Sequence, residues 1–238
     1  MITLDHVSKS YGKRKKAVDD LSLSIPSGEV YGFLGPNGAG KSTTIKMLVG
    51  LLRPDAGHLS VDGVDVQQDP ITVKRNIGYV PDEPLFYRKM TGRDHLGFIA
   101  DLYHVEDRWA RADALCRLFD FTTLNDEISS YSHGMKQKLA VISAMIHQPR
   151  LLILDEPMVG LDPKSSYTLK QEMVRYAKEG NTVFFSTHVL EVAQEVCTRV
   201  GIIDRGKLRF DGTLEELRQG TDRSLEDLFL SLTEETNG

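Results

Sequence analysis

The fold of this chain is decided by the stretch Val30-Tyr31-Gly32-Phe33-Leu34-Gly35-Pro36-Asn37-Gly38-Ala39-Gly40-Lys41-Ser42-Thr43. Its first five residues form a short apolar run after a Pro-Ser-Gly turn, which predicts a buried strand. The remainder fits the pattern G-x-x-x-x-G-K-[ST], which is typical of a loop that binds phosphate. A helix is expected over residues 42–51, before Pro54. The order strand, glycine-rich loop, helix is the one that this mechanism requires.

The loop carries the groups that phosphate binding needs. Glycine adopts backbone conformations closed to other residues, so successive N–H groups can turn inward around phosphate oxygens. The Lys41 ammonium adds positive charge, the Ser42 hydroxyl suits Mg²⁺, and the helix directs its positive end at the same anion. The alternative is a flexible surface loop, which the predicted strand and helix disfavour. The candidate phosphate-binding residues are Gly35, Pro36, Asn37, Gly38, Ala39, Gly40, Lys41, Ser42 and Thr43.

Two acidic residues follow a second apolar run, Leu151–Leu154. They are Asp155 and Glu156, and they would emerge at the carboxyl edge of a parallel sheet, where such sheets bind ligands. We expect Asp155 to hold Mg²⁺ through water and Glu156 to orient or deprotonate the attacking water. His188 follows the apolar run 182–186 and is a candidate to contact the γ-phosphate, although a lone histidine after a strand is usually a surface residue.

Periodicity along the rest of the chain predicts one α/β domain over residues 1–238. Residues 151–154 and 182–186 indicate central parallel strands, and a helix over 165–178 between them makes a βαβ unit. Apolar residues recur at helical spacing over 84–150, which indicates a helical insert. The other expected elements are an edge strand at 2–11, a strand at 21–25, a strand and turn at 58–66, a hairpin at 200–210 and a short amphipathic helix at 224–232.

Composition limits the partners and the compartment. The chain has 238 residues, 40% of them hydrophobic, and its net charge is −5, which does not indicate a nucleic-acid-binding surface. The basic run at 13–16 is interpreted as a solvated loop. Two cysteines in a chain of this length favour a reducing cytosol. The N-terminus lacks the pattern of a signal peptide, and the longest apolar runs, about eight residues, are far below the about 20 of a membrane span.

Five segments, in this order, resemble the ATPase domains of ABC transporters: 37–43, Tyr131-Ser132-His133-Gly134-Met135, Asp155-Glu156-Pro157, Gly160-Leu161-Asp162 and Ser186-Thr187-His188. The resemblance covers nearly the whole chain. It implies an α/β fold with a P-loop NTPase core, which is a RecA-like parallel sheet, together with an antiparallel β subdomain and the helical insert. It also implies ATP and Mg²⁺ as cofactors.

The resemblance assigns roles to residues outside the phosphate loop. The family signature usually reads Leu-Ser-Gly-Gly-Gln, and here only Ser132 and Gly134 match it. These two would complete the ATP site of the opposite subunit, so that two copies enclose two nucleotides. Asp162 belongs to the loop that crosses the dimer interface. Tyr11 matches the aromatic residue that stacks on adenine, and the alternative is a strand-end tyrosine in a small core.

Asp82 is a departure from the family pattern. It stands where these ATPases carry glutamine, in the loop between the core and the helical insert. When ionised, aspartate only accepts hydrogen bonds, and it would stand near Asp155, Glu156 and the phosphates. We expect this crowding to raise its pKa and a contact with Mg²⁺ to run through water.

These observations predict the ATP-hydrolysing subunit of an ABC transporter, at the cytoplasmic face of the cell membrane. It would work as a homodimer, or as a heterodimer with a similar ATPase, beneath a separately encoded permease. Phe86 and Tyr87 would contact the permease or pack in the insert's own core. The compact signature and the tail resemble export ATPases. The alternatives are a related ATPase that acts on ribosomes or DNA, and a non-catalytic regulatory subunit.

Overall fold

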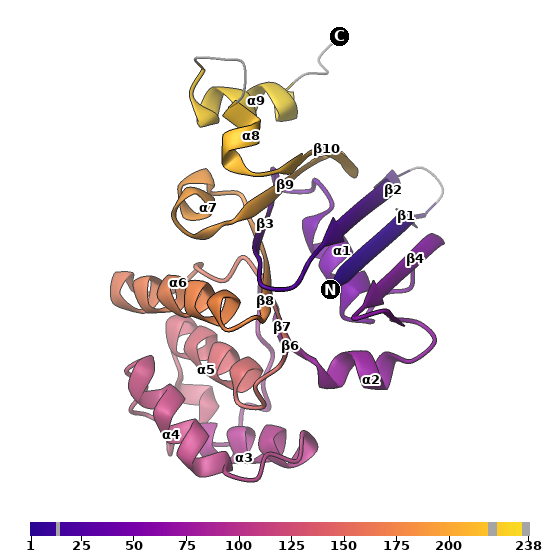
Figure 1. Cartoon of the computed structure of the whole chain (residues 1–238). Helices are drawn as coiled ribbons and strands as arrows, with labels where there is room; N and C mark the ends of the chain where they lie inside the picture. Colours follow the sequence, from indigo (N-terminus) through magenta and orange to yellow (C-terminus); the bar gives the residue numbers. More distant parts are fainter. Residues whose placement is uncertain (13–14, 219–222, 235–238) are drawn as a thin grey trace.

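A computed structural model describes residues 1–12, 15–218 and 223–234. Two sheets and a set of helices make up the described chain (Figure 1). The larger sheet has six strands in the order β10-β9-β3-β8-β7-β6. Their bounds are Lys207–Gly212, Arg199–Asp204, Val30–Leu34, Thr182–Thr187, Leu151–Asp155 and Ile77–Val80.

Five strands of this sheet run parallel, and β10 pairs antiparallel with β9. The residues of β3, β7 and β8 are all buried, as expected for parallel strands covered on both faces. Successive side chains of β3 point to opposite faces of the sheet. Tyr31 and Phe33 therefore enter one core, and Val30 enters another.

The smaller sheet is antiparallel, in the order β2-β1-β4-β5. These strands span Lys15–Ile25, Ile2–Tyr11, Ala56–Val61 and Val64–Asp65. The prediction of an edge strand at 2–11 is wrong, because β1 lies between β2 and β4. The predicted basic loop at 13–16 is only partly testable. Residues 13 and 14 lie outside the described residues, and Lys16 belongs to β2.

Helices cover the larger sheet. In Figure 1, α5 and α6 lie beside it, α3 and α4 lie beyond α5, and α1 lies between the two sheets. The predicted helix at 165–178 is α6, and the tail helix is α9. The helices are α1 (Lys41–Leu48), α2 (Pro70–Arg75), α3 (Gly92–Leu102), α4 (Arg108–Leu118), α5 (His133–Met145), α6 (Pro163–Lys178), α7 (Leu190–Val196), α8 (Leu214–Arg218) and α9 (Leu225–Glu234).

Two large apolar cores hold the layers together. One joins α1, both sheets and residues such as Ile45 and Phe184. The other joins the opposite face of the larger sheet to the helices of the 84–150 segment and α6, through residues such as Leu139 and Met173. The predicted fold class, with a parallel-stranded core, an antiparallel sheet and added helices, is confirmed. The predicted limits of the helical insert, 84–150, stay a prediction.

Candidate nucleotide-binding site

Three neighbouring strands bring the predicted site residues to one edge of the larger sheet. β8 lies between β3 and β7, and all three are parallel, so their carboxyl ends meet. The glycine-rich loop follows β3, Asp155 ends β7 and Glu156 follows it, and His188 follows β8. Residues more than a hundred positions apart in the sequence therefore share one edge, as the motifs predicted.

The glycine-rich loop needs its glycines at two close approaches. A Cβ on Gly35 would lie 2.2 Å from the carbonyl oxygen of Ile203, and one on Gly40 would lie 2.4 Å from that of Ala17. Gly40 also has a φ of 117° as the N-cap of α1. By contrast, a Cβ on Gly38 would meet nothing within 4 Å, so this residue faces open space. One side of the loop thus packs against the protein, and the other side presents its backbone to open space.

Lys41 is the first residue of α1, and its side chain is 6% exposed. Its ammonium donates to the carbonyl oxygens of Gly35 at 2.6 Å and Pro36 at 3.2 Å. It also lies 3.5 Å from Glu156 Oε1. A buried cation is costly unless it is paired. The loop and Glu156 therefore hold the positive charge at the point where the motif predicts phosphate.

Glu156 lies within the site, and Asp155 is buried behind it. Asp155 is 2% exposed, and its Oδ1 accepts a 2.5 Å hydrogen bond from Ser186 Oγ in β8. The same Ser186 oxygen accepts from the backbone N–H of Glu156 at 3.0 Å. The Ser186 hydroxyl thus contacts both acidic residues. Sequence reasoning missed this role of Ser186. The only signal was a serine at the end of a buried strand.

Glu156 has a left-handed backbone, with a φ of 47°. A non-glycine residue at this φ is uncommon, and such conformations cluster at functional sites. Its carboxylate lies 3.1 Å from Nδ1 of His188. The predicted general base and the predicted γ-phosphate contact are therefore neighbours. The His188 side chain is 47% exposed, and its contact with a γ-phosphate stays a prediction.

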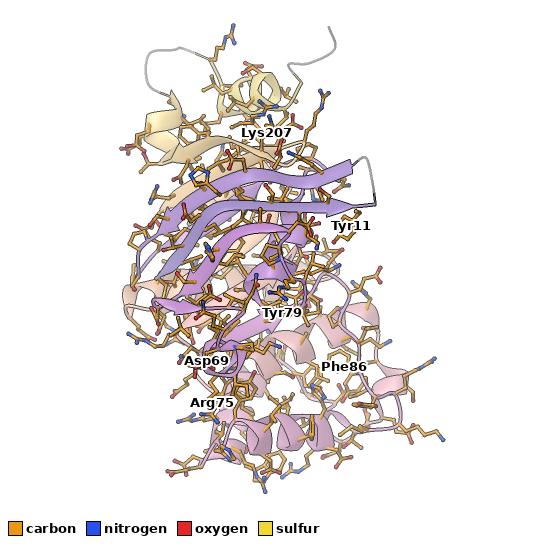
Figure 2. All side chains as sticks on the ribbon, turned by 90° about the vertical axis from the view of Figure 1, so that its right-hand side faces the viewer. Tyr11, Asp69, Arg75, Tyr79, Phe86 and Lys207 are labelled. Carbon is orange, nitrogen blue, oxygen red and sulfur yellow. The ribbon has the colours of Figure 1, made fainter. Side chains whose placement is uncertain are left out.

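A cavity of about 280 Å³ opens between these groups. Tyr11, at the end of β1, lines it and is 51% exposed, which excludes burial in a small core. Figure 2 shows Tyr11 at the margin of the antiparallel sheet. The cavity is lined by Tyr11, Ala17, Asn37, Gly38, Gly40, Lys41, Ser42, Thr43, Asp82 and Glu156. An exposed ring beside the phosphate loop suits a flat base such as adenine.

Asp82, just beyond β6, lines the same cavity. Burial, followed by the negative charges of Asp155 and Glu156, raises its pKa above the ordinary value for aspartate. The expected direction of this shift is therefore confirmed.

The remaining predicted site residues lie elsewhere in the chain. Ser132 is the N-cap of α5, and its Oγ accepts from the N–H of Met135 at 3.2 Å. Asp162 is the N-cap of α6 and accepts from Ser165 N at 2.9 Å. Neither they nor Gly134 line the described cavity at Lys41. This placement is required if they act on the nucleotide of a second copy.

A family model described as ABC transporter matches residues 18–159. The chain belongs to the ABC transporter family. This family consists of ATPases, so the chain binds and hydrolyses ATP. Among the described residues, no helix is both long and apolar enough to span a membrane.

Curated relatives and solved structures agree with this family. The ABC transporter ATP-binding protein NatA of Bacillus subtilis is 38% identical, over 96% of this chain and 95% of NatA. The linearmycin resistance ATP-binding protein LnrL of the same organism is 37% identical, over 91% of this chain and 70% of LnrL. A solved ATP-binding subunit of an ABC transporter superposes with a TM-score of 0.91 at 31% identity, covering 98% of this chain and 99% of that one.

A second cavity, of about 370 Å³, lies on the side of the ABC ATPase where the larger sheet meets α3 and α5. We call it the apolar groove. Its lining includes Tyr79, Phe86 and Tyr103, and Leu85 at its margin is 92% exposed. Tyr79 and Phe86 lie on one face in Figure 2. Phe86 packs edge-on against His95, whereas Tyr87 is 74% exposed. Phe86 therefore packs within the protein, and contact of the exposed Tyr87 with a permease stays a prediction.

Proposed function

We propose that this ABC ATPase is the ATP-hydrolysing subunit of an export system, in which it drives a separately encoded permease. One observation carries the catalytic part. Lys41, Glu156 and His188 converge at the mouth of the phosphate loop, with contacts of 3.5 Å and 3.1 Å to the Glu156 carboxylate. This is the set of groups that binds a γ-phosphate and orients water against it.

Each residue has a distinct part in this reaction. Tyr11 would stack on adenine, and the N–H groups of the loop would bind the phosphate oxygens. On arrival of ATP, the Lys41 ammonium would exchange the carbonyls of Gly35 and Pro36 for phosphate. Glu156 would take the proton of the attacking water, and His188 would contact the γ-phosphate and hold the carboxylate in place.

The donor set near the loop suits Mg²⁺. Hard oxygen atoms are available from the Ser42 hydroxyl and the carboxylates of Asp155 and Asp82. Within the described ranges, no group of three or more His, Cys, Asp or Glu could hold a metal by itself. This fits an ion that keeps several waters and takes other ligands from ATP. Mg²⁺ neutralises phosphate charge when bound there.

The proposal includes a dimer that encloses two ATP molecules. Ser132, an exposed N-cap at the start of α5, would offer its hydroxyl and the helix end to the γ-phosphate in a second copy. Gly134 would let the backbone approach the phosphate, and Asp162 would lie at the interface. The partner is a second copy or a similar ATPase. A solved ATP-binding cassette bound to ADP and Pi is a dimer. At 23% identity and a TM-score of 0.82, its similarity to this chain supports only the fold of the single chain.

The apolar groove is the surface we assign to the permease. It begins where β6 leads into the Asp82 loop, so a segment seated in it would touch an element that also lines the ATP cavity. Exposed Leu85 and Tyr87 extend the apolar surface beyond the groove. Such contiguous apolar surface marks interaction sites. The subunit would then lie at the cytoplasmic face of the membrane.

The proposal that the system exports its substrate rests on what the relatives are named for. LnrL is named for linearmycin resistance, and BcrA of Bacillus licheniformis, at 35% identity, for bacitracin transport. A regulatory subunit without activity is disfavoured because Lys41, Glu156 and His188 are present and in contact. An ATPase that acts on nucleic acid is disfavoured by the net charge of −5.

Leu85→Glu tests the permease assignment in membranes that hold the co-expressed permease. A charge in an apolar interface opposes docking, so we expect the stimulation of ATP hydrolysis by the permease to be lost. Ile71→Glu is the matched control, because Ile71 is 66% exposed and does not line the groove. Undiminished stimulation in Leu85→Glu, with the permease still bound, would refute the assignment.

A further inference from the structure

Ser186 lies near the carboxyl end of β8, beside the acidic end of β7. It is 0% exposed, and in the parallel pairing of the two strands it stands opposite Asp155. Ser186 does not line the described ATP cavity, so it cannot touch a nucleotide that is bound there. Any part that Ser186 has in hydrolysis must therefore act through the residues that it contacts.

The Ser186 hydroxyl donates one hydrogen bond and accepts another. It donates its single proton to Asp155 Oδ1 at 2.5 Å, and its oxygen accepts from the backbone N–H of Glu156 at 3.0 Å. An ionised carboxylate can only accept, and a backbone N–H can only donate. The direction of both bonds is therefore fixed, and each bond polarises the other.

The backbone of Glu156 needs this hydrogen bond. Its φ of 47° is uncommon for a residue with a Cβ, and such a conformation persists only where the surrounding structure over-determines it. The direction of the N–H sets the peptide plane that precedes the Glu156 α-carbon. The bond to Ser186 therefore restrains the direction in which the Glu156 side chain leaves the backbone.

The carboxylate of Glu156 is held by the same part of the chain. His188, two residues after Ser186, places Nδ1 3.1 Å from the carboxylate. On the other side, the Lys41 ammonium lies 3.5 Å from Glu156 Oε1. The segment at the end of β8 thus contacts Glu156 at its backbone and at its carboxylate, and loss of the backbone contact would free the side chain to turn away from Lys41.

We propose that Ser186 is a positioning residue for ATP hydrolysis, which holds the Glu156 carboxylate beside the phosphate loop through the Glu156 N–H. This proposal rests on the role of Glu156 in the proposed function. Asp155 has an indirect part, because it accepts the hydroxyl proton and so leaves the Ser186 oxygen to accept from Glu156. ATP binding depends on the phosphate loop and Lys41, which Ser186 does not contact.

Ser186→Ala tests this proposal, because it removes the hydroxyl from the strand. We expect kcat to fall about 10- to 10²-fold, since a small misplacement of a reacting group has an effect of that size. The dissociation constant of ATP should stay within about threefold of the wild-type value. Ser186→Thr keeps the hydroxyl and should restore most of the lost kcat.

Thr182→Val is the matched control in the same strand. The Thr182 hydroxyl is as deeply buried as that of Ser186, but it has no hydrogen-bond partner among the described residues. We expect this variant to keep the wild-type kcat. Ser186→Cys takes the place of Ser186→Ala if the latter fails to fold, because a thiol fills the space of the hydroxyl but is a weak hydrogen-bond partner.

Combination with Glu156→Gln separates positioning from a general structural role. If Ser186 acts through the Glu156 carboxylate, Ser186→Ala should lower the kcat of Glu156→Gln by less than about twofold, because the positioned group is already lost. An unchanged kcat in folded Ser186→Ala or Ser186→Cys would overturn the positioning role, as would full multiplication of the two effects in the double variant. Wild-type turnover in Glu156→Gln alone would instead refute the role of Glu156 in the proposed function.

Discussion

At the scale of single residues, the site depends on how Glu156 is held. Its backbone is left-handed, its N–H donates to Ser186, and its carboxylate lies between Lys41 and His188. Its Oε1 lies 3.5 Å from the Lys41 ammonium, beside the phosphate loop. Lys41 and His188 then fix the direction of the Glu156 carboxylate. A group that orients water requires such a fixed direction.

Glu156→Gln should lower turnover by about 10² to 10⁴-fold, because the amide keeps the shape but cannot accept the proton of water. ATP should still bind, since the loop and Lys41 are unchanged. Steady-state hydrolysis together with equilibrium ATP binding measures both effects. Glu191→Gln, an exposed change in α7, is the control. Turnover near that of the control would place the catalytic base elsewhere.

His147 gives a pH dependence of stability. It lies beyond α5 in the apolar groove, stacks on Tyr103 at 3.8 Å, and its Nε2 donates to Ile77 O at 3.1 Å. Burial lowers its pKa to about 4 from 6.5. Between pH 6.5 and 4 the unfolded state therefore binds more protons than the folded state, so stability falls as the pH falls.

The loss across this window is about 3 kcal/mol of unfolding free energy. This pH-dependent loss of unfolding free energy should be absent from His147→Phe, because any other destabilisation by that substitution is the same at every pH. Urea unfolding of both proteins at pH 7 and pH 4 makes the comparison. His104→Asn, at an exposed residue with a φ of 55°, serves as the control. Parallel losses in the wild type and His147→Phe would show that His147 is not the group responsible.

At the scale of elements, the start of α5 depends on two facing glycines. Gly134→Ala would bring a methyl group within 2.6 Å of Gly160 O. Overpacking of this kind costs about 1–3 kcal/mol. Gly97→Ala in α3 is the matched control. Its methyl group meets Trp109 at an ordinary 3.4 Å, so helix propensity should make it neutral or stabilising. Thermal unfolding of both variants tests this, and equal effects would contradict the crowded contact.

The elements with strong local signals could be predicted from the sequence. These are β3, β7 and β8, which are apolar runs bounded by turns, and α6, which has a clear helical period. The helices α2 and α7 were missed because six or seven residues show too little periodicity. The four-residue strand β6 was not assigned either. The neighbours of β1 were mispredicted, since alternation within a strand does not reveal which distant strand pairs with it.

Some features of the candidate site could likewise be predicted from local sequence, and others could not. Glycine spacing and the acidic pair after β7 identify the phosphate loop, Asp155 and Glu156, because these groups are local in sequence. The link from Ser186 to both acidic residues, the exposure of Tyr11 and the contact between Gly134 and Gly160 depend on packing between distant segments. No single-sequence pattern contains that packing, so these features came only with the structure.

At the scale of the whole molecule, the proposed function places two halves of an ATP site on separate surfaces of one chain. The cavity beside Tyr11 and Lys41 would be one half, and the start of α5 would be the other. Ser132 and Gly134 do not line the described cavity of their own chain. We therefore expect two chains to close around ATP and to complete each other's sites.

Light scattering of Glu156→Gln tests this claim most directly. Slow hydrolysis should let the variant accumulate at twice the mass of one chain with Mg·ATP, and at the mass of one chain without it. Adding Ser132→Asp keeps an N-cap for α5 but directs a negative charge at the γ-phosphate of the second copy, so this double variant should stay monomeric. A single-chain mass for Glu156→Gln at saturating Mg·ATP, or a dimer that forms equally with Ser132→Asp, would contradict the account.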